Sequence, residues 1–100
     1  MALICDSDAD GECITLHISD RFDFSVHRGF HEGCLARPRA RIYLIDLEGV
    51  TSMDSSALGM LLLLREHAGG DDADIRILNA GTDLRNTLRV AGLDRLLTLG

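Results

Sequence analysis

The sequence lacks the features that mark membrane-spanning and secreted proteins. Its longest unbroken apolar stretch, Met60 to Leu64, is far too short to span a bilayer. The first residues form neither a basic segment nor a long apolar one, so we expect no signal peptide. The three cysteines are an odd number and form no Cys-x-x-Cys pair. Reduced thiols in a cytoplasmic protein are the simplest interpretation.

Positive charge and nucleotide-binding motifs are also scarce. Sixteen acidic residues outnumber ten basic ones, which gives a net charge of −6. Nucleic-acid backbones and anionic membrane surfaces repel such a chain, so we expect neither as a partner. The GxxxxGK[ST] and GxGxxG loops are absent, which excludes ATP binding by those routes. The Gly-x-Ser-x-Gly elbow is absent too, and we expect neither enzyme activity nor a cofactor.

What remains is the composition of one small globular domain, residues 1–100, with 46% apolar and 26% charged residues. The clearest strand pattern is Cys13 to Ile18, where Ile14, Leu16 and Ile18 alternate with Thr15 and His17. His17 should therefore lie on a solvated face. Leu3 to Cys5 precedes it across a polar turn, and the two segments predict a hairpin.

Helices and strands then alternate along the chain. After a loop at Ser19 to Asp23, we expect a helix from Phe24 to Ala36, ended by Pro38, with Val26, Phe30 and Cys34 on its buried side. A strand covered on both faces is expected from Arg41 to Leu47, followed by a helix from Asp54 to Gly69-Gly70 and a strand from Ile75 to Asn79. A third helix is expected from Asp83 to Ala91, with Thr82 as its cap and Gly92 as its stop. A short helix or strand from Asp94 to Leu99 comes last. In the third helix, Leu84, Leu88 and Ala91 should face inward. The order β-β-α-β-α-β-α predicts an α/β fold: a mixed sheet of four to five strands with three to four helices packed on it.

The start of the second helix is the most informative stretch. Asp54 or Ser55 is expected as its first, capping residue, after a loop formed by residues 49–52. Capping needs one hydroxyl, yet Thr51, Ser52, Ser55 and Ser56 lie within six residues. The two serines can be plain capping residues. The position also suits a phosphate, because free backbone N–H groups and the positive end of the helix dipole face it.

The same stretch resembles a known family signature. Asp54-Ser55-Ser56-Ala57-Leu58-Gly59 is similar to the Asp-Ser-Ser/Thr-Gly-Leu-Gly motif of STAS domains, the anti-sigma factor antagonist family. Arg21-Phe22-Asp23 is similar to the second half of the family's Gly-x-Leu-Asp motif. The resemblance covers roughly Ile14 to Leu97 and implies the element order given above. The chain departs from the family at Ala57, where the family usually has glycine.

The resemblance implies a phosphorylation switch. It makes Ser55 the residue that a serine kinase phosphorylates and a serine phosphatase restores, with Ser56 in reserve. The unphosphorylated protein would bind an anti-sigma factor, which could itself be the kinase, and so release a sigma factor. Thr51, Ser52, Met53, Asp54 and Ser56 would form the docking loop around the phosphorylated serine.

Two interpretations of the second helix stay open. Ala57, Met60, Leu61, Leu64 and Ala68 form its inward stripe, and Leu58 and Leu62 lie off that stripe. These two leucines can be covered by neighbouring elements or can form a partner interface, with Arg65 and Glu66 as its polar rim. In the resembling family this helix faces the anti-sigma factor. A permanent scaffold subunit, such as the small STAS component of a lipid-transport ATPase complex, is the alternative function, and it would need no phosphate.

The first helix contains His27, His31 and Cys34 at spacings that can direct three donors to one side. A metal site would normally require a fourth ligand, and Cys34 already belongs to the apolar stripe. We therefore expect no metal, and a partly exposed helix face instead.

Overall fold

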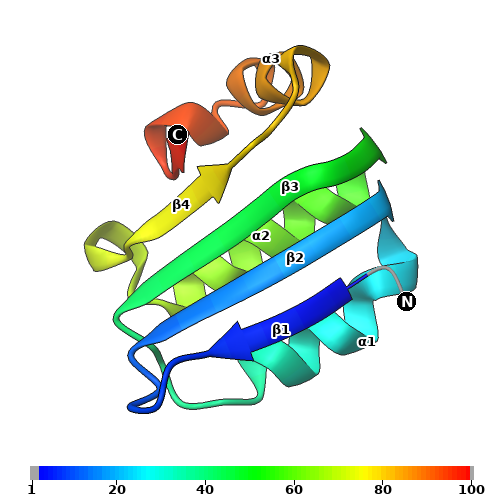
Figure 1. Ribbon diagram of the computed structural model, residues 1–100. Helices are drawn as coiled ribbons and strands as arrows, with labels where there is room; N and C mark the ends of the chain where they lie inside the picture. The colour runs from blue at the N-terminus through cyan, green and yellow to red at the C-terminus, as the bar shows by residue number, and fades with distance from the viewer. Residues whose placement is uncertain (1–2, 100) are drawn as a thin grey trace.

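An antiparallel hairpin of Leu3–Ser7 (β1) and Cys13–Phe22 (β2) forms one edge of the sheet. It is seen in the computed structural model of the chain, which describes residues 3–99 (Figure 1). The hairpin is the one that the alternating pattern predicted. Residues 1, 2 and 100, the ends of the expected domain, lie outside the described part of the chain.

The remaining strands all run parallel to β2. They are Ile42–Met53 (β3), Ile75–Leu78 (β4) and Thr98–Leu99 (β5), and the five strands lie side by side in the order of the sequence. Parallel neighbours need crossover connections, which the helices provide. The mixed sheet of an α/β fold is therefore confirmed, and β5 is added to the end of the expected order.

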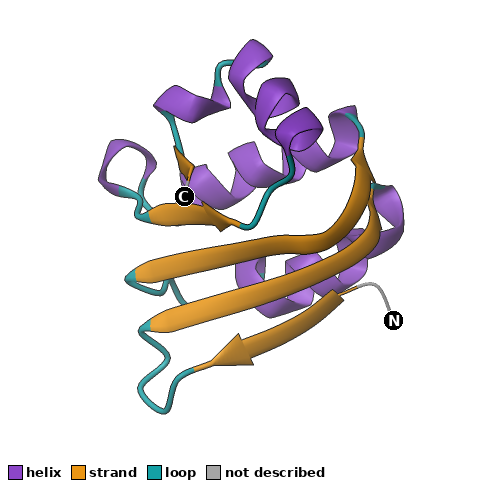
Figure 2. Cartoon of the chain, turned by 45° about the horizontal axis from the view of Figure 1, so that its top comes forward, coloured by secondary structure: helices purple, strands orange, loops and turns teal. Residues whose placement is uncertain are grey.

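The long helix Ser55–His67 (α2) joins β3 to β4, and Thr82–Val90 (α3) joins β4 to β5. In Figure 1, α2 and the short helix His27–Phe30 (α1) both lie behind β1, β2 and β3, and Figure 2 shows α3 beyond β4. The strand residues that face the helices form the core; among them are Leu16, Ile45, Leu47 and Ile77. Alternate residues on the other face stay partly exposed, His17 among them, as expected.

The predicted first helix is present from Phe24 to Leu35, but its type changes along its length. The segment is a 3₁₀ turn Phe24–Val26 (η1), the single α-helical turn α1, and a π-helical turn His31–Leu35 (η2). Its stripe of Val26, Phe30 and Cys34 is nevertheless buried, as predicted. Gly33 lets this segment pack closely on β1, because a Cβ there would lie 3.2 Å from Cys5 Sγ.

The two central strands are longer than the sequence predicted. The expected loops at Ser19 to Asp23 and at residues 49–52 are wrong, because β2 and β3 continue to pair from Ser19–Gly49 to Phe22–Met53. This pairing passes two register shifts. A Cβ on Gly49 would lie 3.0 Å from Ser19 Cβ, so the missing side chain permits the close pairing. Strand pairing compensates for weak local propensity here.

Corrections at the third helix are small. Gly81, not Thr82, is the capping residue, and Ala91 ends the helix exposed instead of facing inward. Leu84 and Leu88 are buried as predicted, and Gly92 has the expected left-handed backbone, with φ of 80°. The last segment is both a 3₁₀ turn, Leu93–Arg95 (η4), and the strand β5. Among residues 3–99, no helix combines the length and apolar character needed to cross a membrane.

Candidate functional site

The helix α2 begins where β3 leaves the sheet, and Asp54 fixes that junction. Its backbone N–H donates to the carbonyl of Phe22 at 3.4 Å. Its extended backbone places the carboxylate over the first turn, where Oδ1 accepts from the N–H groups of Ser56 at 2.9 Å and Ala57 at 3.2 Å. Asp54 is thus the capping residue, one of the two that the sequence offered.

Ser55 is the first residue of α2 and is exposed. Within residues 3–99 its hydroxyl has no hydrogen-bond partner, whereas Ser56, one residue along, is half-buried. Because Asp54 already caps the helix, the Ser55 hydroxyl is not needed for capping. It is an accessible hydroxyl on a rigid helix start.

One expectation about this site is wrong. The sequence suggested that free backbone N–H groups wait there for a phosphate, yet the Asp54 carboxylate already occupies those of Ser56 and Ala57. A phosphate on Ser55 would lie beside that carboxylate. The helix dipole would attract the phosphate. The Asp54 carboxylate would repel it, or the phosphate would replace that carboxylate as the acceptor of the two N–H groups.

The residues expected as a docking loop are the end of a strand. Thr51 and Ser52 are exposed in β3, and Thr51 Oγ1 donates to the carbonyl of Asp20 at 3.0 Å. Met53, half-buried, pairs with Phe22. Thr51, Ser52 and Met53 thus lead to Ser55 along a paired strand instead of a loop, and only Asp54 and Ser56 are its direct neighbours.

The outer face of α2 is apolar and uncovered. Its inward stripe of Ala57, Met60, Leu61, Leu64 and Ala68 is buried as predicted. Leu62 is 42% exposed and its neighbour Leu63 is 53% exposed, whereas Leu58 is half-buried against the core. Arg65, expected at the rim, is half-buried, and its Nη2 donates to the exposed Asp71 carboxylate at 2.7 Å.

Two exposed apolar residues, Leu63 and Phe24, were not predicted from the sequence. Phe24 is 66% exposed in η1, directly after β2, and so lies at the same end of the sheet as Ser55. Its ring stacks on His27 with centroids 4.7 Å apart. The available signal was an aromatic residue that does not fit the Val26, Phe30 and Cys34 stripe.

The three candidate metal donors of the first helical segment do not converge. His27 stacks on Phe24, and its other ring neighbour is His31 at 6.4 Å. Cys34 is fully buried, and burial raises the pKa of its thiol to about 12. A buried thiol with that pKa is neutral at physiological pH and packs as an apolar side chain.

A second polar cluster crosses the sheet face that α1 and α2 leave uncovered. Asp46 on β3 accepts from Asn79 at 3.1 Å and pairs with His17 on β2, whose Nδ1 lies 3.0 Å from Asp46 Oδ2. The other ring nitrogen of His17 lies 3.4 Å from Asp6 on β1. The Asn79 bond is the largest cause of a lowered pKa of Asp46, and the Glu48 N–H and His17 lower it further. This cluster links three strands and the end of a fourth.

Comparison with known proteins identifies the relatives of the chain. A family model described as the Mlab, STAS domain matches residues 5–98. A STAS-domain containing protein of Pseudomonas aeruginosa (strain UCBPP-PA14) is 42% identical over 99 residues, which cover 96% of each chain.

Solved structures share the fold at lower identity. An anti-sigma factor antagonist from Mycobacterium paratuberculosis superposes with a TM-score of 0.78 at 18% identity, over 97% of this chain and 82% of that one. The Bacillus cell fate determinant SpoIIAA in its phosphorylated form superposes with a TM-score of 0.70 at 14% identity, over 99% of this chain and 91% of that one. At these low identities the superpositions show a shared fold and nothing more specific.

Proposed function

The chain belongs to the STAS domain family, and from this premise we propose that it is an anti-sigma factor antagonist gated by phosphorylation of Ser55. The observation that most supports this function is the Ser55 hydroxyl, exposed and without a hydrogen bond within residues 3–99, on a helix start that Asp54 caps independently. A kinase can modify that hydroxyl without removing a structural bond. The protein would act in the cytoplasm, as the substrate of a serine kinase and a serine phosphatase, with no catalytic activity of its own.

The proposed partner interface surrounds Ser55. It includes the exposed Leu62 and Leu63 on α2, Phe24 on η1, and the exposed part of the half-buried Leu58. Contiguous exposed apolar side chains on a soluble domain often mark a protein–protein interaction site. Arg65 would form part of the rim through its contact with Asp71 and Glu66.

Phosphate at Ser55 would act on binding more than on folding. It adds a charge of about −1.5 to −2 next to Asp54, in a protein whose net charge is already −6. The helix N-terminus tolerates that charge, whereas an interface pressed over it would suffer repulsion and desolvation. A coupling of about 1–3 kcal/mol would change the affinity for the anti-sigma factor roughly 5- to 150-fold.

The test has two parts. First, the intact protein is isolated from its native cells, and its mass and fragments are measured to locate any phosphate. Second, Ser55→Ala and Ser55→Asp are used to capture partners, and the affinity for the captured partner is measured. We expect Ser55→Asp to lose the anti-sigma factor and Ser55→Ala to keep it.

Thr82→Asp is the matched control, because Thr82 is also the exposed first residue of a helix, at the start of α3. It adds the same charge at an equivalent helix position away from the proposed interface. Equal binding by the Ser55→Asp, Ser55→Ala and Thr82→Asp variants would exclude the switch.

A permanent scaffold subunit is the second candidate. The matching family model is described as Mlab, in contrast to the antagonists among the structural neighbours, and this description favours it. In this case the apolar face of α2 would be covered permanently by one subunit of a larger complex. The chain would remain unmodified under all growth conditions and would co-purify with one constant partner.

A further inference from the structure

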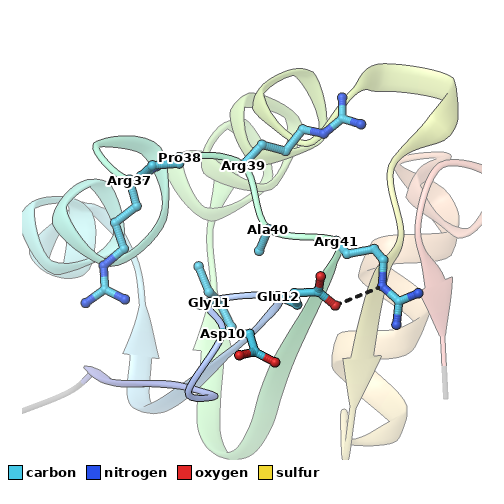
Figure 3. A pocket seen from close by; sticks show the side chains of 9 residues that line it. Asp10, Gly11, Glu12, Arg37, Pro38, Arg39, Ala40 and Arg41 are labelled. Carbon is cyan, nitrogen blue, oxygen red and sulfur yellow. Dashed lines mark ion pairs between the residues drawn. The ribbon is translucent and has the colours of Figure 1, made fainter.

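A hollow of about 530 Å³ lies between the β1–β2 turn and the segment that leads into β3 (Figure 3). Asp10, Gly11 and Glu12 line it on one side and residues 37–41 on the other. This volume falls within the range of small-molecule sites, roughly 300–1,000 Å³. Since the hollow is at the start of β3 and Ser55 follows its end, the two sites lie at opposite ends of that strand. The proposed function gives the hollow no role.

Basic charge is concentrated at this hollow. All ten basic residues of the chain are arginines, and Arg37, Arg39 and Arg41 lie within five positions of one another. Within residues 3–99, Arg37 and Arg39 have no carboxylate at ion-pair distance, although acidic residues outnumber basic ones. The guanidinium of Arg39 turns away toward Gly69, where it would lie 2.7 Å from an added Cβ. Arg37 is therefore the cation left free to bind an anion in the hollow.

The backbone around the hollow is already fixed. The N–H groups of Arg41 and Ile42 both donate to the carbonyl of Glu12 at 2.9 Å. The N–H of Ala40 donates to the Tyr43 hydroxyl, also at 2.9 Å, in a buried bond. A ligand would not have to order this backbone, which lowers the entropic cost of binding.

The hollow also contains acceptors. Asp10 and Glu12 line it, and the Glu12 carboxylate points to Arg41, with which it pairs at 3.7 Å across exposed side chains (Figure 3). Two carboxylates disfavour a ligand that is negatively charged throughout. They accept hydrogen bonds from hydroxyl groups, while a planar guanidinium matches the oxygens of a phosphate. The buried Ile14 and Ala40 add an apolar floor.

We propose that this hollow binds a small sugar phosphate, with the phosphate on Arg37 and the sugar hydroxyls on Asp10 and Glu12. The site is separate from the partner interface, so the two proposals can fail independently.

The test is an NMR titration of the ¹⁵N-labelled protein with ribose 5-phosphate, inorganic phosphate and ribose. We expect saturable shifts of the Gly11, Ala40 and Arg41 amides, with ribose 5-phosphate binding more tightly than either fragment. Arg37→Gln should weaken ribose 5-phosphate roughly tenfold, because it removes one charge-assisted contact, and should leave ribose unchanged. Glu12→Gln removes a negative charge and should strengthen the binding of inorganic phosphate, but it should strengthen that of ribose 5-phosphate less, because it also weakens an acceptor for the sugar hydroxyls.

Arg28→Gln is the control, since Arg28 is an exposed arginine on α1 that pairs with Glu32. It should bind all three probes as the wild type does. The proposal is overturned if the amides of the hollow do not shift, if ribose binds as tightly as ribose 5-phosphate, or if Arg37→Gln and Arg28→Gln behave alike.

Discussion

One carboxylate, that of Asp54, caps the start of α2 without help from the Ser55 hydroxyl. The Asp54 carboxylate accepts from the N–H groups of Ser56 and Ala57, and the Ala57 N–H also donates to the Asp54 backbone carbonyl at 3.1 Å. The hydroxyl of Ser55, directly beside it, takes no part in that capping. Sequence motifs with an acid before a serine can therefore keep the helix intact while the serine changes its charge.

We expect Asp54→Ala to destabilise the protein by about 1 kcal/mol, because the Ser56 N–H loses its acceptor and the Ala57 N–H keeps only the backbone carbonyl of residue 54. For a domain of this size that lowers Tm by several degrees. Thermal and urea unfolding followed by circular dichroism measure the change. Asp54→Asn keeps an oxygen acceptor and should recover most of the lost stability. If Asp54→Ala and Asp54→Asn were equally stable, the capping role would be contradicted.

At the scale of elements, α2 has one apolar side that is buried and a second that is exposed. One side is buried against the sheet, and the other exposes Leu62 and Leu63 on the same helix that Ser55 begins. An exposed leucine contributes little to folding, so its replacement should leave stability nearly unchanged. Replacing an exposed leucine of α2 should therefore weaken partner binding without lowering folding stability.

Leu62→Ser should weaken binding of the captured partner by roughly tenfold without a measurable change in Tm. Val90→Ser on α3 is the matched control, because Val90 is 89% exposed but lies on another helix. Affinity is measured by calorimetry on the purified pair. If the two variants bind equally well, α2 is not the interface.

The polar cluster on the uncovered sheet face should make stability depend on pH. The pKa of Asp46 is lowered in the folded protein, first by the Asn79 bond, so folding favours its ionised form. This contribution is fully present above the pKa of the unfolded chain, about 3.9, and is lost as the pH falls through the lower folded value. The wild type should therefore lose it only at acidic pH.

Asp46→Asn removes this contribution. We expect the variant to have a lower Tm than the wild type at neutral pH, by an amount that corresponds to about 1 kcal/mol. The difference should shrink as the pH falls below about 4, because the unfolded chain takes up the proton there first, and should be smallest once the folded carboxylate is protonated as well. Calorimetric melting curves between acidic and neutral pH test it, and a difference that stays constant over that range would contradict it.

At the scale of the whole molecule, the core extends through both the sheet and the first helical segment. Cys34 is fully buried there, and burial raises the pKa of its thiol, with a smaller contribution from the neighbouring Cys5. Burial keeps the Cys34 thiol neutral, and only a thiolate reacts readily with alkylating reagents. Its reaction requires that the core open.

A variant with Cys5→Ala and Cys13→Ala leaves Cys34 as its single thiol. We expect iodoacetamide to modify it in native buffer only through global opening, and the logarithm of the labelling rate to rise in proportion to the fall in unfolding free energy as urea is added. Mass spectrometry follows the modification. Rapid labelling without urea would show that this part of the core opens locally.

The sequence by itself determined the elements whose pattern is local. Alternation over Ile14, Leu16 and Ile18 predicted β2, the stripe from Ala57 to Ala68 predicted the buried side of α2, and Asp54 predicted its start. These predictions succeed because side-chain periodicity and capping depend on residues a few positions apart. The signature around Ser55 is also a local pattern, and it was sufficient to locate the candidate site.

Only the tertiary structure decided what depends on residues distant in the sequence. The extension of β2 and β3 to Phe22 and Met53 comes from pairing between two strands, which no local pattern encodes. Gly33 packs closely on Cys5 in a first helix that changes from a 3₁₀ turn to an α turn and then a π turn. The position of Phe24 at the same end of the sheet as the start of α2, and of Arg37 across from Asp10, exists only because the sheet brings their segments together. Periodicity identifies a face of an element, but the neighbours that cover that face are set by the whole fold.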